Sequence, residues 1–355
     1  MTKAPFSCES NNDTPKRSKK SKTSQPTTSS PTTTLFFDCN QLRMADPGGK
    51  IPLTDSTFKN AVSAYVAGDP GKAAVQSFVG NDINTWDVSL VTDMSLAFKD
   101  AASFNEPLNC WDMSSVTNTS QMFKGAASFD QPIGNWDMSS VTSTAEMFRG
   151  AASFNQPIEK WDMSSVTSTF AMFQNANAFD QPIGIWNMSS VNTTDSMFQN
   201  AASFDQPIGN WNMSSVTTTA EMFRDAASFN QPIGDWDMSS VTITFAMFQD
   251  AVAFDQPIGN WNMSSVAFTL FMFSGAVAFN QPIGDWNMTS VTNAVFMFRD
   301  AMAFNQDLCP WGDLLQASAS VGSMFSGASS CPDTTTDTPD LSASPPGPFC
   351  FACSI

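Results

Sequence analysis

Apolar side chains recur along most of this chain with one fixed period. Tryptophan stands at residues 86, 111, 136, 161, 186, 211, 236, 261, 286 and 311, always at the same interval, and these are all ten tryptophans of the protein. Phenylalanine repeats at the same spacing in two columns, from Phe98 to Phe298 and from Phe104 to Phe304. A period of about 25 residues is typical of a solenoid, in which each coil buries its apolar face by stacking on its neighbours. The pattern predicts about ten coils of this length.

Within one repeat the hydrophobic period changes, which predicts two kinds of element. Trp136 and Met138 alternate with Asp137, as on a short strand with one buried face. The next inward positions are spaced as on one side of a short helix: Val141, Thr144, Phe148 and Ala151. Ser143 and Glu146 stand three residues apart and would close a capping box at the start of that helix. One coil is thus expected to contain a strand, a corner, a short helical segment and a return loop.

The segments that flank the repeats differ in composition. Residues 1–34 are rich in Ser, Thr, Pro and Lys, and we expect a disordered tail. We assign residues 35–82 to an N-terminal cap, in which DSTFKNAVSAYVAG predicts a helix, with Asp55 or Ser56 as its cap and Gly68 as its stop. The repeat solenoid is assigned to residues 83–330, and residues 331–355 to a C-terminal tail rich in Pro, Ser and Thr.

The I-x-x-W-x-M segment resembles the L-x-x-L-x-L signature of leucine-rich repeats. The fuller stretch FDQPIGNWDMSSVTSTAEMF, residues 129–148, is similar to the BspA-like leucine-rich-repeat surface proteins in their tryptophan-bearing variant, and the resemblance extends over residues 83–325. It implies a cell-surface or extracellular setting and a role in adhesion or protein binding, and it offers no catalytic residue. The expected fold class is therefore α/β: a right-handed, leucine-rich-repeat-like solenoid with an N-terminal capping helix. The chain departs from that family in one column. The methionine expected after Val-Thr is present only as Met94, and later repeats have Thr or Ala there.

Charge and composition exclude several classes of function. The formal net charge is −17, and because the first 35 residues carry +4, the remainder carries −21. A body this acidic repels phosphate backbones, so we expect no nucleic-acid partner. Histidine is absent, which removes Ser/His and Cys/His catalysis, and nearly every polar residue is a copy of its neighbours rather than part of a unique constellation. We therefore expect neither enzyme activity nor a cofactor or metal. No apolar run marks a signal peptide or a membrane span.

The polar columns have structural explanations. The tryptophans face inward with the methionines, so they are expected in the core rather than on a sugar-binding shelf. The Asp/Asn column that follows each tryptophan is expected to be solvated or hydrogen-bonded, and the column that begins with Asn105 and Asp130 is expected to cap turns. Threonine pairs such as Thr142 and Thr144 have one inward member, which disfavours a flat ice-binding array.

The cysteines gather near the C-terminal end. Cys309 and Cys331 bracket the irregular last coil, and we predict a disulfide between these two in an oxidising compartment. Cys350 and Cys353 have redox or metal spacing, but they stand without a second pair, and the sequence assigns them no role.

One outward stripe changes from polar to apolar along the repeats. At the seventh, ninth and tenth residues after each tryptophan, early coils carry polar or small residues, as in Asn118, Ser120 and Gln121. Late coils instead carry Ile243, Phe245, Phe268, Leu270, Phe271, Val295 and Phe296. A contiguous exposed apolar patch tends to mark a partner site, and the alternative is that these side chains are tucked between coils as extra core. We predict a non-enzymatic binding scaffold with a protein-partner or self-association surface here. The competing hypotheses are a purely structural surface or wall protein and, less favoured, an ice- or carbohydrate-binding solenoid.

Overall fold

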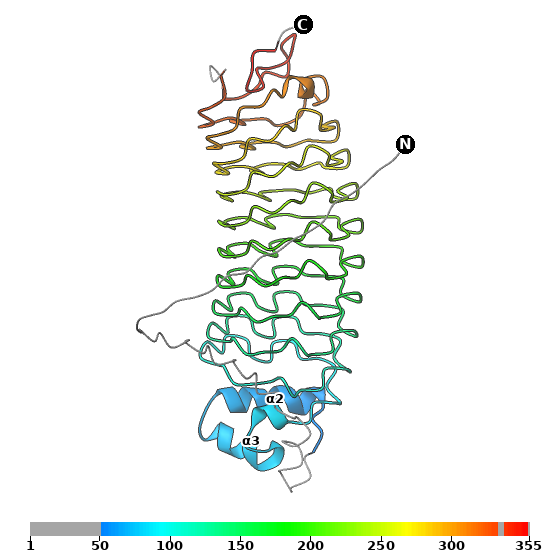
Figure 1. The fold of residues 1–355 in the computed structure, drawn as a ribbon, viewed down its shortest axis with the longest axis vertical. Coiled ribbons are helices and arrows are strands. Elements are labelled where there is room, and N and C mark those ends of the chain that lie inside the picture. Colours follow the sequence, from blue (N-terminus) through cyan, green and yellow to red (C-terminus); the bar gives the residue numbers. More distant parts are fainter. Residues whose placement is uncertain (1–50, 333–336, 354–355) are drawn as a thin grey trace, which may run out of the picture. The chain divides into compact units, whose positions relative to one another are not determined.

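The computed structural model describes residues 51–332 and 337–353, all of which belong to one compact unit, residues 39–355 (Figure 1). Two helices, α2 (Asp55–Val66) and α3 (Gly71–Val79), pack against each other at the N-terminal end. The repeated coils follow one after another from there. Two 3₁₀ turns, η1 (Ile83–Thr85) and η2 (Cys309–Trp311), stand at the beginning and end of the coils. The tail expected over residues 1–34 lies outside the described residues.

Helix α2 confirms the helix expected in the cap, but its N-cap is Thr54 rather than Asp55 or Ser56. Thr57 Oγ1 accepts a hydrogen bond from the Thr54 backbone N–H at 2.8 Å, which fixes the first turn. Asp55 instead reaches the first coil, where its carboxylate accepts the backbone N–H groups of Asp93 and Thr92 at 3.0 and 2.7 Å. These two bonds lower the pKa of Asp55 below its ordinary value. The helix is therefore bonded to the coils by its first residue.

Successive coils are joined by isolated parallel β-bridges. The bridges connect equivalent residues of neighbouring repeats, from Asp93 through Ser143 to Asn293, and the last step, from Asn293 to Ser320, is slightly longer than one repeat. After each bridge residue, every second backbone N–H donates a hydrogen bond to the next coil. In one pair of coils the N–H groups of Thr119, Gln121, Phe123 and Gly125 point toward the next coil and donate to the carbonyls of Ser143, Ala145, Met147 and Arg149 at 2.7–3.1 Å. The same set recurs from coil to coil.

The strand and the helix expected within each coil are not formed in the described residues. Ile133–Met138 contains a turn, and Val141–Ala151 contains a bridge followed by turns. A helix cannot continue there because Glu146 and Gly150 have positive φ angles of 55° and 73°. The expected capping box of Ser143 and Glu146 is also absent, since the Glu146 side chain pairs with cations. We propose that this ladder of bridged coils is a solenoid; its right-handed sense and its leucine-rich-repeat class stay predictions.

The inward residues of the coils form one continuous core. Each tryptophan column member is buried, and neighbouring indoles stack in parallel, as Trp161 does on Trp186 with ring centroids 6.4 Å apart. The two phenylalanine columns also stack on themselves and on each other, with 3.9 Å between the centroids of Phe173 and Phe179. Trp136 and Met138 are buried while Asp137 is exposed, so the inward register expected from the sequence is confirmed. Apolar burial on this scale is the dominant stabilising contribution.

The repeated polar residues connect each coil to its neighbour. The indole Nε1–H of Trp136 donates to the carbonyl of Leu108 in the preceding coil at 3.1 Å. Asp130 Oδ1 accepts from the backbone N–H of Asn155 at 2.9 Å and from Gln156 Nε2 at 2.8 Å. The prediction that this second Asp/Asn column caps turns is therefore wrong, because its side chains bond to the following coil instead. Asn and Asp both offer the Oδ1 acceptor, which explains why they alternate in the column.

The other Asp/Asn column acts locally. Asp137 Oδ1 accepts the backbone N–H and the hydroxyl of Ser139 at 3.0 and 2.6 Å, two residues further along the chain. These exposed carboxylates are hydrogen-bonded, as expected, but they close an Asx turn inside one coil rather than linking a ladder of coils.

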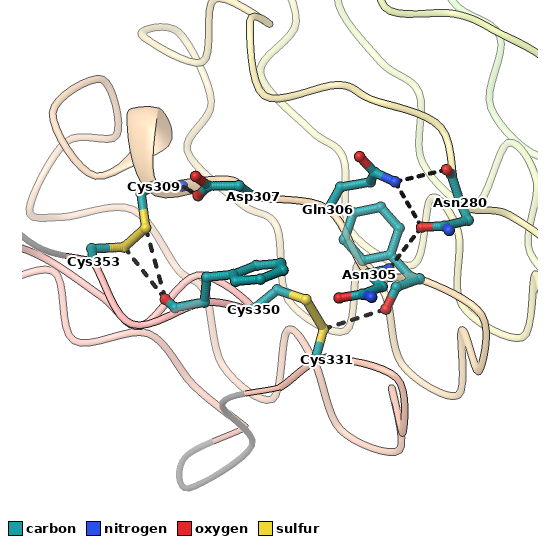
Figure 2. The surroundings of a disulfide bond; sticks show 10 residues. Asn280, Asn305, Gln306, Asp307, Cys309, Cys331, Cys350 and Cys353 are labelled. Atoms are coloured by element: carbon teal, nitrogen blue, oxygen red, sulfur yellow. Dashed lines mark hydrogen bonds between the residues drawn. A yellow bond between two sulfur atoms is a disulfide. The ribbon is translucent and has the colours of Figure 1, made fainter.

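Two disulfides hold the C-terminal end, and they differ from the predicted pair. Cys309 bonds to Cys353 and Cys331 bonds to Cys350, with Cα atoms 5.5 and 4.8 Å apart (Figure 2). The predicted Cys309–Cys331 bond is wrong because the chain beyond residue 336 returns to the last coil and brings both late cysteines there. The Phe325 backbone N–H donates to the Asp337 carbonyl at 3.0 Å in the same place. Residues 337–353, expected as part of a tail, are thus bonded to the coils.

Candidate interaction face

The bridged segment of each coil carries outward side chains that differ from coil to coil. We call this surface the bridge face and define it as the seventh, ninth, tenth and thirteenth residues after each tryptophan. The seventh position alone holds Asp93, Asn118, Ser143, Ser168, Thr193, Thr218, Ile243, Phe268 and Asn293. Most of these side chains are partly exposed. The position just before each tryptophan also varies, but between Cys110 and Asp285 it is polar except for Ile185.

The backbone of the bridge face is unusual at the tenth position. Residues there have positive φ in successive coils although none is glycine, including Gln121, Glu146, Phe271 and Phe296. L-residues adopt this left-handed region at a cost of roughly 1–2 kcal/mol, so the inter-coil hydrogen bonds must hold it. The larger side chains at this position meet the equivalent positions of adjacent coils, as Gln121 meets Glu146 and Phe271 meets Phe296, whereas Ala171 and Ala246 are buried.

The early part of the bridge face is mostly polar, with Leu96 and Phe170 as exposed apolar exceptions, and several of its polar groups pair with one another. Glu146 accepts from Lys124, from Arg149 at 2.6 Å and from Gln121 at 2.9 Å. Burial alone would raise the pKa of Glu146, but the hydrogen bonds from Lys124 and Arg149 outweigh burial and leave the pKa below its ordinary value. Glu221 and Arg224 form a similar ion pair at 3.2 Å. These side chains satisfy each other and leave little for a ligand.

Asp195 is the exception among the charged groups of this face. Burial raises the pKa of its carboxyl group, although Thr218 Oγ1 donates to it at 2.6 Å and the Ala220 backbone N–H donates to it at 2.8 Å. No cation pairs with Asp195 among the ion pairs of the described residues. The carboxylate is therefore held by neutral donors only.

The late part of the bridge face is the apolar stripe expected from the sequence: Ile243, Phe245, Phe268, Leu270, Phe271, Val295 and Phe296. All seven side chains are partly exposed or exposed, and Phe268 has 42% of its surface accessible. The Phe245 and Phe271 rings lie edge to face with their centroids 6.3 Å apart, and Phe271 stacks on Phe296 at 5.1 Å. The stripe is thus continuous across three coils and lies at the surface. That a partner binds it stays a prediction.

The coils that carry the apolar stripe have a negative net charge. Residues 226–311 contain seven aspartates and a single arginine, a formal net charge of −6. That arginine, Arg299, places its guanidinium over the Phe296 ring, 5.5 Å from the centroid. Its side chain also reaches Asp300, with 3.2 Å between Nε and the carboxylate. The stripe therefore belongs to an acidic part of the chain.

The cap holds two other surface features. Tyr65 donates its hydroxyl to Glu106, which also accepts from Lys72 at 3.0 Å, and burial with this bond raises the pKa of Tyr65 to about 12. The contacts join the helices to the first coil. Near the start of α2 an apolar groove of about 410 Å³ includes Ile51 and Phe78, and we assign it no ligand.

Neither α2 nor α3, the two α-helices of residues 51–332 and 337–353, has the length and apolar character of a membrane-spanning helix. In the same residues, Cys, Asp and Glu side chains form no group of three or more that would suit a metal ion.

Coils that bond to one another through the same contacts define a repeat-containing protein. The chain belongs to the family described as "Mycoplasma protein of unknown function, DUF285", whose model matches residues 72–184, 145–253, 170–276 and 232–337. Together these overlapping matches cover about three quarters of the chain. No curated protein gives a significant match. The finer resemblance to BspA-like surface proteins stays a prediction.

Proposed function

We propose that the protein is a non-enzymatic repeat scaffold that binds a protein partner through the bridge face, at the cell surface or outside the cell. The observation that carries this proposal is the variation of the bridge face. Its columns differ from coil to coil, whereas the tryptophan, phenylalanine and inter-coil Asp/Asn columns scarcely change. Stacking explains the uniform columns completely, and it gives no reason for a row of partly exposed phenylalanines in late coils.

A purely structural surface or wall protein is the competing hypothesis. Such a protein needs identical coils and gains nothing from a face that changes from paired charges at Glu146 to partly exposed aromatic rings at Phe271 and Phe296. Contiguous exposed apolar surface is costly in water and tends to mark sites of interaction. Repeat-specific variation on an outward surface therefore favours discrete binding.

The extracellular setting is supported by the cysteines. Two disulfides, Cys309–Cys353 and Cys331–Cys350, close the C-terminal end. Structural disulfides persist in oxidising compartments and are rare in a reducing cytosol. The resemblance to BspA-like surface proteins points the same way. Surface labelling of intact native cells with a membrane-impermeant reagent tests this point, and labelling only after lysis would contradict it.

The binding role is tested by site-specific photo-cross-linking in the native cell. A photoreactive phenylalanine analogue replaces Phe268 in the full chain, and the matched control carries it at Ile185, which is 78% exposed and lies outside the bridge face. We expect an adduct of discrete mass from position 268 and none of that mass from position 185. Identical adduct patterns at both positions, or no adduct at either, would refute a partner site on the bridge face.

A further inference from the structure

Two of the four rings in the apolar stripe have a neighbour on a ring face. Phe271 and Phe296 lie face to face at 5.1 Å, and the Arg299 guanidinium is positioned over the Phe296 ring. A sugar that stacks on an aromatic residue needs an open ring face, and stacking leaves less of these two rings available. Their remaining surface, together with the aliphatic side chains of Leu270 and Val295, is suited to apolar side chains. The stripe therefore favours a protein ligand over a carbohydrate.

The spacing of the stripe matches one turn of a helix. Ring centroids of Phe245, Phe271 and Phe296 are separated by 6.3 and 5.1 Å along the coils. An α-helix rises about 5.4 Å per turn, so a helix laid along the stack places one apolar side chain per turn against each ring. Apolar anchors at intervals of three and four residues are how amphipathic helices bind to apolar surfaces.

The negative charge of the coils that carry the stripe determines which charged side chains the polar face of such a helix should have. Residues 226–311 carry a formal net charge of −6, and the chain beyond the first 35 residues carries −21. This field attracts cationic segments and repels anionic ones, including the acidic body of a second copy of the chain.

We propose that the apolar stripe binds an amphipathic helix of a partner protein, with leucine-like side chains on one side and Lys or Arg on the other. The inference deepens the proposed binding function and rests on it. Phe245, Phe268, Phe271 and Phe296 supply the apolar contacts, and the aspartates of the surrounding coils supply the attraction for the cationic side.

Three designed peptides of equal length, each long enough for about five helical turns, test this chemistry with the full chain. The first is a helical Leu/Lys amphipath, the second replaces Lys with Glu, and the third replaces Leu with Ser. Binding is measured by fluorescence anisotropy at about 0.15 M salt, where exposed charges are screened beyond roughly 8 Å. We expect only the Leu/Lys peptide to bind tightly. Equal binding of the Leu/Glu or the Ser/Lys peptide would overturn the proposal.

Variants of the chain locate the binding site. A triple variant in which Ser replaces Phe245, Phe271 and Phe296 keeps every charge of the chain. It should bind the Leu/Lys peptide at least about tenfold more weakly, whereas Ile185→Ser should leave the affinity for that peptide unchanged. If circular dichroism shows that the triple variant is unfolded, Phe268→Ser decides, since that side chain is already 42% exposed. Undiminished binding by the folded variant would overturn the proposal.

The remaining alternative is that a second copy of the chain binds the apolar stripe, and light scattering over about a hundredfold range of protein concentration tests it. If the chain forms a dimer and Phe268→Ser dissociates that dimer, the second copy is the occupant and the cationic-helix proposal is overturned. A discrete cross-link at position 268 combined with failure of the Leu/Lys peptide would leave the binding function standing and refute only this partner chemistry.

Discussion

Truncating one tryptophan in the middle of the ladder gives the sharpest test of the fold. Trp186 lies between Trp161 and Trp211, with ring centroids 6.4 and 6.5 Å away, and Phe173 is 6.3 Å away on a third side. Its side chain is 4% exposed, and its Nε1–H donates to the Ile158 carbonyl at 3.1 Å. Trp186→Ala removes all of these contacts in one coil and leaves the other coils intact.

The expected cost follows from the cavity and the lost hydrogen bond. Replacing a buried aromatic side chain by Ala costs about 3–5 kcal/mol of unfolding free energy. The Ile158 carbonyl still accepts the Trp161 backbone N–H at 3.2 Å, so loss of the indole donor adds only about 0.5–1.5 kcal/mol. Trp186→Phe loses this donor and part of the ring volume but keeps an apolar ring, so we expect a smaller cost of about 1–3 kcal/mol for that variant. Each coil stabilises its immediate neighbours, and the coils around Trp186 should therefore open first.

Urea unfolding followed by circular dichroism measures these costs, and native-state hydrogen exchange shows where the chain opens. The matched control is Ile185→Ala, one residue away and 78% exposed, which should change the unfolding free energy by less than about 0.5 kcal/mol. Faster exchange should appear in the coils of Trp161 and Trp211 and not in α2. If Trp186→Ala and Ile185→Ala unfold at the same urea concentration, the inward tryptophan ladder is refuted.

Three further predictions concern single contacts. Asp180→Asn keeps the Oδ1 acceptor for the Asp205 N–H and Gln206 Nε2, at 3.0 and 2.8 Å, and should be near neutral in urea unfolding, whereas Asp180→Ala should cost about 1–3 kcal/mol. Burial raises the folded-state pKa of Asp195, so the stability that Asp195 contributes is present below its unfolded value near 3.8 and is lost as pH rises through the folded pKa. Asp195→Asn should therefore stabilise the protein at neutral pH and lose that advantage in acid; the same advantage at both pH values would contradict the assignment. Breaking the Cys331–Cys350 bond, with its sequence separation of 19, by Cys331→Ser should cost about 3 kcal/mol in the chain-entropy estimate, and proteolysis should then cut residues 337–353 first.

The sequence was sufficient for the period and the inward register because both depend on apolar side chains that repeat without interruption. Trp136, Met138 and Phe148 are buried as their spacing indicates. Helix α2 was predictable for the same reason, since Phe58, Val62 and Tyr65 line one buried face. Helix α3 was not predicted, although Val75, Phe78 and Val79 are spaced as on one side of a helix; the helix is only nine residues long, and Val79 alone among them is buried.

The conformation of the coils was not predictable from spacing. Intervals of three and four residues indicate a helix, but here the same intervals arise from turns that are held by the neighbouring coil. A residue such as Glu146 has no intrinsic preference for positive φ, and it adopts that angle because its N–H donates to the Phe170 carbonyl of the next coil at 2.7 Å. Long-range contacts therefore overrode the local pattern.

The candidate site was foreseen only in part. The seven apolar residues were identified from their columns, but their exposure could not be, because it depends on backbone turns that hydrogen bonds to the neighbouring coil hold in place. The disulfide partners also escaped the sequence, since the separation of Cys309 and Cys331 along the chain carries no information about the return of residues 337–353 to the last coil.

The inter-coil Asp/Asn column makes the units of this protein interchangeable. The Oδ1 atom of Asp130 accepts the backbone N–H of Asn155, and the same contact joins Asn155 to Asp180 and Asp180 to Asp205. The N···O distances are 2.9–3.0 Å. A chain that loses or duplicates one whole repeat therefore rebuilds the junction it had before, with no new interface to evolve. Recombination between such units can lengthen or shorten the protein in whole steps while both ends keep their own closures. The number of coils is free to drift, and with it the length of the surface that each molecule displays.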